Sequence, residues 1–326
     1  MSQSLSGTTD YEIMRGDLIR LLYDRTKDKV WFMFGTTVDG FEQLDDSVEV
    51  LFSNGDKGRY DLVIGADGQW SRTRKQMLGP GVEDPIHFLG VYAAYFTFPR
   101  PLEKGEVYNG TTYIAPGKRL LFTRRHSTDR VQAYLVGLND SERVMAARKG
   151  GLEDEKALFS ELFGSAGWRP EELIKEMKDS VDFYCERMGV LRLDTWSNGR
   201  VALLGDAAYC PTATTGMGTT SSLVGAYVLA GEIQRHCSRD AASKETVSEA
   251  LHTYEERFRP LMKTVQDSIE KDKTYRHKMP SGPILLMALN LFLAIALFFR
   301  IDVLAKHIMR EDIGDWKLPD YKGMDL

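Results

Sequence analysis

The sequence predicts an α/β (α+β) protein in which an antiparallel sheet is inserted into an open α/β domain. Short apolar runs at residues 62–64 and 201–204 are followed by Gly65-Ala-Asp-Gly68 and by Gly205-Asp206. Such runs are typical of buried strands, and ligands of open α/β sheets bind outside the carboxyl ends of the strands. Between them, residues 87–138 alternate apolar and polar side chains, as antiparallel strands do. The two strand ends therefore predict one ligand site.

The composition is that of a folded protein that handles small molecules. Of the 326 residues, 43% are hydrophobic and 27% are charged, which is the balance of a soluble globular chain. The net charge of -5 and the lack of a long Lys/Arg run predict no nucleic-acid partner. Cys185, Cys210 and Cys237 are too scattered for a disulfide framework or a metal set. The polar start lacks the apolar core of a secretory signal, so we expect an intracellular protein.

The N-terminal part is expected to hold one helix and several short strands. Apolar residues recur at near-helical spacing over residues 12–23, and Arg15 stands near the start of this helix. A guanidinium there suits a phosphate or a ligand hydroxyl, whereas a surface ion pair is the alternative. Strands are expected at residues 30–34, 41–44 and 48–52, with a hairpin turn at Asn54-Gly55. Ser71 is expected to cap the helix that follows Asp67-Gly68.

The middle of the chain is expected to form the inserted sheet with helices beside it. Strands are predicted at residues 90–98, 111–115, 119–123 and 131–138. Helices are predicted at residues 153–163 and 170–178, the second beginning at a proline. The chain then returns towards the sheet through Phe183, Tyr184, Met188 and Val190. These side chains are expected either to pack in the core or to line a pocket for a hydrophobic substrate.

Residues 199–234 are predicted to run from strand to loop to helix. Pro211, Gly216 and Gly218 interrupt regular structure and allow the backbone to approach a ligand closely. The hydroxyls of residues 219–222 are expected to cap a helix over residues 223–233, whose N-terminus then faces the loop. Its free N–H groups and positive dipole end favour an anionic or electron-rich ligand, and Asp206 suits ligand hydroxyls. An ordinary strand-to-helix turn is the alternative interpretation.

The C-terminal part contains an unusual apolar run. Before it, a helix over residues 251–269 is predicted to break or kink at Pro260, and residues 271–278 are predicted to form a basic turn. The apolar run begins at Ile284 and ends at Phe299. A bilayer span needs about 20 residues, so this run is short for one. A helix packed against the body and peripheral membrane contact are the two main alternatives, and a true span is the third.

The motifs together resemble those of the single-component flavoprotein aromatic hydroxylases, the family typified by para-hydroxybenzoate hydroxylase. The segment Asp61-Leu-Val-Ile-Gly-Ala-Asp-Gly-Gln-Trp-Ser-Arg-Thr-Arg74 is similar to the Asp-Gly motif of that family. Gly205-Asp206-Ala-Ala, with Pro211 and Gly216-Met-Gly218, is similar to its second, Gly-Asp flavin motif. The helix with Arg15 and the segment 254–260 also resemble family elements. The resemblance covers residues 12–266.

The resemblance implies a site for FAD. Asp206 would bind the ribityl chain, and Gly218 at the helix N-terminus would face the pyrimidine edge of the flavin ring. Arg15 and Asp67 would support the cofactor. Gly205, Gly216 and Met217 complete the cofactor-binding set that the motifs imply. The sequence identifies no catalytic acid or base.

The resemblance also implies a reaction. The family consumes NAD(P)H and O2 and inserts one oxygen atom into an organic substrate. We therefore expect an FAD-dependent monooxygenase that hydroxylates or epoxidises a hydrophobic aromatic, polyketide or terpenoid-like small molecule, in secondary metabolism. The alternative is a catalytically inactive, flavoprotein-derived binding or accessory protein.

Two departures from the family pattern shape the domain prediction. Tyr209 stands where the family commonly has His, and no Gly-x-Gly-x-x-Gly strand-turn-helix precedes Glu12. The sequence therefore predicts a partial, Rossmann-like FAD-binding domain at residues 1–86 and 191–270. A substrate domain is predicted at residues 87–190, and a C-terminal helical region at residues 271–326.

Overall fold

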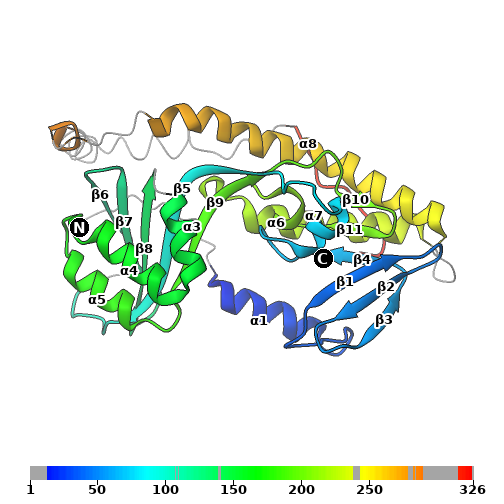
Figure 1. Cartoon of the computed structure of the whole chain (residues 1–326), viewed down its shortest axis with the longest axis horizontal. Helices are drawn as coiled ribbons and strands as arrows, with labels where there is room; N and C mark the ends of the chain where they lie inside the picture. The colour runs from blue at the N-terminus through cyan, green and yellow to red at the C-terminus, as the bar shows by residue number, and fades with distance from the viewer. Residues whose placement is uncertain are drawn as a thin grey trace.

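The computed structural model describes residues 13–106, 108, 110–138, 141–237, 243–277, 282, 284–288 and 315–324. Figure 1 shows an elongated molecule with two lobes, joined by long strands and by the helix α8 (Lys244–His277). One lobe holds a five-stranded sheet, and the other holds two three-stranded sheets with α7 (Gly218–His236). The helix α1 (Arg15–Thr26) lies below the junction of the lobes in this view.

The antiparallel sheet predicted for the middle of the chain is confirmed. Its order is β6-β7-β8-β5-β9, and each neighbouring pair is antiparallel. The strands are β5 (Ile86–Pro99), β6 (Gly110–Ala115), β7 (Arg119–Arg125), β8 (Arg130–Leu138) and β9 (Tyr184–Leu191). Because side chains alternate along a strand, β5 turns Ala94, Phe96 and Phe98 towards one buried face. The opposite face is left for the junction between the lobes.

Helices cover the buried face of this sheet. They are α3 (Ser141–Gly150), α4 (Leu152–Phe163) and α5 (Pro170–Asp179). Phe159 and Phe163 of α4 are fully buried in the core that the helices share with the sheet. The sequence predicts α4 and α5 within a residue of their observed starts. It does not predict α3, because this polar segment shows little amphipathic periodicity.

The two strand ends that carry Gly and Asp lie side by side, as the sequence predicts. β4 (Val63–Gly65) and β11 (Val201–Leu203) are parallel neighbours, with Gly65 opposite Leu203. The short β10 (Ser197–Asn198) completes this sheet on the other side of β11. Both loops therefore leave the same edge of the sheet. A Cβ on Gly65 would lie 2.6 Å from the Thr73 side chain, so the close approach of α2 (Arg72–Leu78) requires glycine there.

An antiparallel meander flanks this parallel pair. It consists of β1 (Val38–Gln43), β2 (Val48–Phe52) and β3 (Lys57–Tyr60), and the predicted turn at Asn54-Gly55 joins the last two. The strand predicted at residues 30–34 is wrong, because this segment forms turns and irregular backbone. An apolar run yields a strand only where a sheet edge is available for pairing. Phe32 instead packs against the rings of Tyr23 and Phe34.

α7 begins earlier than the sequence predicts. The helix starts at Gly218 with Met217 at the N-cap, so residues 219–222 lie inside its first turns and do not cap it. The Ser222 hydroxyl donates to the carbonyl of Gly218 at 2.9 Å. The N-cap provides no side-chain hydrogen bond. The first N–H groups of α7 are consequently available to a ligand.

α8 is a single helix through Pro260, so the helix does not break there, and the kink given as the other possibility stays a prediction. A proline removes one backbone hydrogen bond, but packing on both sides maintains the helix because Phe258, Leu261 and Met262 are buried. The predicted basic turn at residues 271–278 is also wrong. Residues 271–277 continue α8, and residue 278 lies outside the described residues.

The apolar run from Ile284 to Phe299 falls mostly outside the described residues. Residues 284–288 are helical, and Leu286 is buried among otherwise exposed neighbours. In the described part of the chain, no helix combines the length and apolar character that crossing a membrane requires. Further on, Tyr321 is buried, and its hydroxyl donates to Glu232 of α7 at 2.6 Å. This bond fastens residues 315–324 to α7.

Gln266 provides a test of how α8 holds the ligand-facing loops. Its buried Nε2 donates to the carbonyls of Leu191 and Tyr209 at 2.7 and 3.0 Å. Because Gln266→Ala leaves two buried carbonyls without that partner, we expect the free energy of unfolding to fall by about 1–3 kcal/mol in urea titrations. Gln234→Ala, which removes one exposed bond of 3.4 Å to the Lys322 carbonyl, is the control and should change it by less than about 0.5 kcal/mol. Equal losses in the two variants would contradict this role of Gln266.

Candidate functional site

A cavity of about 640 Å³ opens where the two strand ends, α1 and β9 meet. It is the size of a site for a cofactor or drug-sized molecule. Its wall is formed by the start of α1, the loop after β4, alternate residues of β9, and the segment from α6 (Asp206–Tyr209) to the start of α7. The predicted residues among its lining are Arg15, Asp67, Asp206, Gly216 and Gly218. The structure therefore brings five of the seven predicted cofactor residues together.

Asp67 supports the loop after β4 by capping α2. Its carboxylate accepts hydrogen bonds from the Ser71 hydroxyl at 2.5 Å and from the Thr73 backbone N–H at 3.0 Å. Ser71 in turn accepts from the backbone N–H of Arg74, so the predicted cap is confirmed. Burial alone would raise the pKa of Asp67, but the hydrogen bonds from Ser71 and Thr73 outweigh it and lower that pKa. Asp67 is thus an ionised carboxylate whose main partners belong to its own loop and helix.

Arg74 connects the loop after β4 with the start of α6. The sequence pattern does not indicate this role. Its side chain is fully buried and forms an ion pair with Asp84, with Nε 2.8 Å from Oδ1. Nη1 donates to the carbonyl of Ala207 at 2.9 Å, and Nη2 donates to the carbonyl of Gln69 at 2.6 Å. One guanidinium therefore contacts the loop after β4 and the start of α6 together. The sequence does not indicate that Arg74 is buried, because this residue lies in a short helix rich in Arg and Lys.

Asp206 is the carboxylate left open to the cavity. It is half-buried and follows Gly205, whose φ of +63° and close approach to the Ser222 hydroxyl favour glycine. Burial raises the pKa of Asp206, and the charge of Glu186 raises it further, while Cys210 and Arg15 oppose this shift. The fold therefore keeps an acid here at an energetic cost to its charged form. Such a group gains from a ligand hydroxyl that donates to it.

Tyr209 turns away from the cavity. It is almost completely buried, and its ring packs 4.6 Å from Trp196 and 5.2 Å from Phe258. A Cβ on Gly225 would lie 2.0 Å from its hydroxyl, so this glycine of α7 makes room for it. Burial raises the pKa of Tyr209 to about 12. The departure from the family's His therefore places a tyrosine in the core and leaves the cavity wall to its neighbours.

The N-terminus of α7 supplies the polar end of the cavity. Gly216 and Gly218 line it, and a Cβ on Gly218 would meet nothing within 4 Å. Thr212 has a positive φ, and its buried hydroxyl has no hydrogen-bond partner among the described residues. Met217 and Gly205 do not line the cavity; Met217 packs in the core beneath the loop. Uncapped N–H groups, an orphaned hydroxyl and a half-buried acid together fit a ligand that is polar and partly anionic, as FAD is.

β9 supplies the other wall. Tyr184, Glu186 and Met188 alternate along the strand and line the cavity. Of the four residues for which the sequence left two alternatives, Tyr184 and Met188 line the cavity, whereas Phe183 and Val190 are buried away from it. Trp70 adds apolar surface from the loop after β4, and Leu223 adds it from α7. This wall suits an apolar or aromatic molecule beside the polar end.

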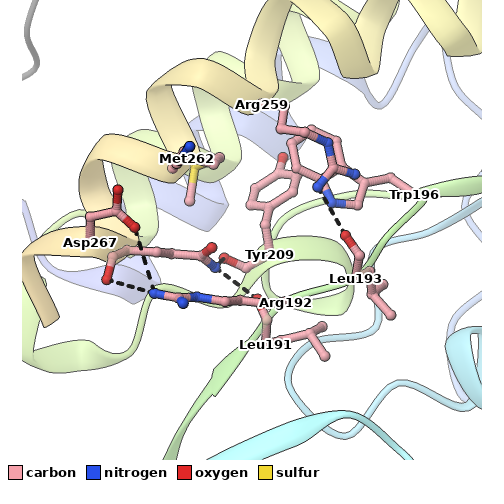
Figure 2. Close-up of a pocket in the computed structure, with 10 residues that line it drawn as sticks. Leu191, Arg192, Leu193, Trp196, Tyr209, Arg259, Met262 and Asp267 are labelled. Carbon is pink, nitrogen blue, oxygen red and sulfur yellow. Dashed lines mark hydrogen bonds and ion pairs between the residues drawn. The ribbon is translucent and has the colours of Figure 1, made fainter. Parts of the chain in front are cut away.

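A smaller cavity of about 210 Å³ lies on the far side of Tyr209, between α8 and the end of β9 (Figure 2). Its two arginine side chains are already engaged. Arg259 donates to the carbonyl of Leu193 at 2.9 Å and lies over the ring of Trp196, and Arg192 donates to the carbonyl of Gln266 at 3.2 Å. These contacts fasten α8 to the end of β9. The predicted cofactor residues do not line this cavity.

The comparison with protein families gives one match that covers most of the chain. A family profile described as an FAD binding domain matches residues 4–268. FAD-dependent monooxygenase asL4 of Sarocladium schorii is 44% identical, over 96% of this chain and 75% of that protein. FAD-dependent monooxygenase asL6 of the same organism is 34% identical, over 98% of this chain and 76% of that protein.

Solved structures show the same fold. The tetracycline destructase Tet(51) aligns with a TM-score of 0.72 and 25% identity, covering 96% of this chain and 77% of its own. HpxO of Klebsiella pneumoniae, in complex with FAD and uric acid, aligns with a TM-score of 0.61 and 21% identity. That alignment covers 86% of this chain and 67% of HpxO, and at this identity it shows the fold alone.

Arg74→Met tests whether the buried guanidinium holds the loops together. Removing the guanidinium takes away the ion pair with Asp84 and the donor to two carbonyls. We therefore expect the free energy of unfolding to fall by about 3–5 kcal/mol, measured by urea denaturation. Arg72→Met is the control, because the Arg72 side chain lies in the same helix and is 67% exposed. It should change stability by less than about 0.5 kcal/mol. A tolerated Arg74→Met would show that the loops do not depend on this bridge.

Asp206→Asn tests the energetic cost of the half-buried acid. Because folding raises the pKa of Asp206, this carboxyl group stays protonated to a higher pH in the native protein than in the unfolded chain. The resulting loss of stability begins near the unfolded pKa of about 3.9 and grows until the pH exceeds the raised folded-state pKa of Asp206. The unfolding midpoint of Asp206→Asn should therefore exceed that of the wild type at pH 7, and the two should converge in acid. A variant that is less stable than the wild type at pH 7 would contradict this account.

Proposed function

Because the chain belongs to the FAD-binding-domain family of FAD-dependent monooxygenases, we propose that it binds FAD in the large cavity. The substrate is a hydrophobic aromatic, polyketide or terpenoid-like small molecule, which is hydroxylated or epoxidised with NAD(P)H as reductant and O2 as oxygen donor. We place this reaction in secondary metabolism. The observation that carries the proposal is one cavity bounded by an uncapped helix N-terminus and a half-buried carboxylate.

Each predicted residue has a distinct task in this proposal. Asp206 accepts hydrogen bonds from the ribityl hydroxyls, and the backbone of Gly216 and Gly218 lies against the ring because neither presents a side chain. Gly205 and Met217 shape the turns on either side of the cavity. Arg15 adds a positive charge at the cavity wall. Asp67 holds α2 and its loop in place.

The chain's own contribution to the reaction is positioning and electrostatics. Bound FAD supplies the redox chemistry, taking electrons from NAD(P)H and activating O2. The first N–H groups of α7 and its dipole stabilise negative charge in the cavity, where they are fixed before any reaction begins. The apolar wall formed by Tyr184, Met188 and Trp70 holds an aromatic substrate and excludes water from one side.

The visible absorbance of the purified full chain after incubation with FAD and removal of free cofactor tests this proposal. We expect a yellow protein that retains flavin, and NAD(P)H oxidation that depends on it. Asp206→Asn should lower flavin affinity by about tenfold or more, because a charged hydrogen-bond acceptor contributes about 1.5–3 kcal/mol. Asp194→Asn, at an exposed position near the end of β9, is the control and should bind as the wild type does. A folded but colourless wild-type chain would support the accessory-protein alternative.

A further inference from the structure

We propose that the Thr212 hydroxyl donates a hydrogen bond to an acceptor on the flavin ring. This inference rests on the proposed function and adds to it a cofactor-binding residue that the family motifs do not mark. Two features of Thr212 carry the inference, namely a buried hydroxyl without a partner and a backbone geometry that suits glycine. Both destabilise the folded chain, and a ligand acceptor beside Thr212 offsets them.

Thr212 lies on the segment that connects the Asp206 turn with the N-terminus of α7. It lines the large cavity together with Asp206, Gly216 and Gly218. A short 3₁₀ helix, Ala213–Thr215, follows Thr212 directly and has Gly216 as its C-cap. The proposed function assigns the ribityl hydroxyls to Asp206 and the flavin ring to Gly216 and Gly218. The segment between these two assignments is therefore part of the same ligand surface.

The Thr212 hydroxyl is buried and unpartnered. The residue is 3% exposed, and its Oγ1 makes no hydrogen bond in the part of the chain that the structure describes. A hydroxyl that leaves water without gaining a hydrogen bond destabilises the folded protein. Because Thr212 lines the cavity, a molecule bound there is within reach of this hydroxyl.

The backbone of Thr212 is strained. Its φ is +63° and its ψ is +151°, a combination that is essentially confined to glycine. For a β-branched residue such a positive φ is a genuine outlier. Thr215 holds this conformation, because its backbone N–H and its hydroxyl both donate to the Thr212 carbonyl, at 3.3 and 3.0 Å. The Thr215 hydroxyl also accepts from the backbone N–H of Met217 at 3.2 Å, which ties Thr212 to the start of α7.

Glycine at position 212 would remove both sources of instability. It has no hydroxyl to leave unpartnered, and it adopts a positive φ without steric strain. Residues held in such sparsely populated backbone conformations cluster at ligand-binding positions, where the surrounding structure maintains them. We therefore attribute the threonine to its hydroxyl, which the strained backbone holds in one place before a ligand binds.

The flavin ring is the part of the cofactor that suits a donor at this position. Asp206 and Glu186 line the cavity with carboxylate acceptors, which suit the donor hydroxyls of a ligand. Thr212 instead adds a side-chain donor, on the segment that leads to Gly216. The ring offers acceptors at its carbonyl oxygens and nitrogens. Reduction adds electron density to these atoms, so a hydrogen bond donated to them is stronger with reduced than with oxidised FAD.

Calorimetric titration of the full chain with FAD tests this assignment. Thr212→Val keeps the β-branched shape and removes the hydroxyl, so we expect FAD to bind about tenfold more weakly than to the wild type. Thr212→Ser keeps a hydroxyl and should bind FAD within about threefold of the wild-type affinity. Circular dichroism verifies that each variant is folded.

Ser221→Ala is the matched control. The Ser221 hydroxyl is also buried and without a hydrogen-bond partner among the described residues, and the residue is 1% exposed, but it does not line the cavity. This variant should leave the FAD affinity unchanged. Because Ser221→Ala and Thr212→Val each remove an unpartnered buried hydroxyl, both should raise the urea midpoint of the full chain without FAD. Weaker FAD binding combined with higher stability distinguishes a ligand-binding hydroxyl from a structural one.

The reduction potential of bound FAD separates a contact to the ring from a contact to the ribityl chain. Thr212→Val should weaken the binding of reduced FAD by a further factor of about three or more, because the lost hydrogen bond is stronger in that state. The bound cofactor is then harder to reduce in this variant than in the wild type. Loss of a ribityl contact would weaken both states equally and leave the potential unchanged.

The outcomes separate this inference from the proposed function. A wild-type chain that retains no FAD contradicts the proposed function and, with it, this inference. If the wild type binds FAD, an unchanged affinity in Thr212→Val contradicts only the role of Thr212. An unchanged potential, equal weakening by Ser221→Ala, or binding by Thr212→Ser as weak as by Thr212→Val overturns the assignment as well. So does a lower urea midpoint of Thr212→Val without FAD, which would show that the hydroxyl stabilises the fold itself.

Discussion

The Arg74 guanidinium is fully buried, and its hydrogen bonds reach both loops that shape the large cavity. Burying a charge carries a large desolvation penalty, so the site depends on its ion pair with Asp84 and on the carbonyls of Gln69 and Ala207. This constraint fixes the spacing between the Asp67 loop and the Asp206 turn. The parallel pair β4 and β11 brings the loops to one edge, and Arg74 sets how they meet.

Three carboxylates around the cavity differ because their surroundings differ. Asp67 is saturated by hydrogen bonds from α2 and belongs to the framework. Burial raises the pKa of Asp206, which lines the cavity. Glu186 is held by two phenols on the sheet, on a wall that the cofactor motifs do not mark. One functional group, the carboxylate, thus occurs in three different settings around the cavity, and its hydrogen bonds distinguish them.

The sequence predicts what depends on local pattern and adjacent strand ends. It gives the paired Gly/Asp ends, the inserted sheet and the Ser71 cap, because each follows from periodicity or from a short motif. The prediction fails where contacts between segments that are far apart in the sequence determine the local structure. The aromatic residues at 30–34 lack a strand to pair with, packing carries α8 through Pro260, and α7 begins at Gly218 despite the hydroxyls that follow. Arg74 and Glu186 escape prediction for the same reason, since Arg74 bonds to Ala207 of α6 and Glu186 accepts from Tyr95 of β5.

The central claim is that the uncapped N-terminus of α7 and the Asp206 turn bind FAD. Hydrogen–deuterium exchange of the full chain, with and without FAD, tests this most directly because it reports on individual backbone amides. We expect slower exchange of the amides at residues 216–220 when FAD is present, with no change at residues 315–324. Unchanged exchange at 216–220, or protection confined to the smaller cavity around Trp196 and Arg259, would contradict it.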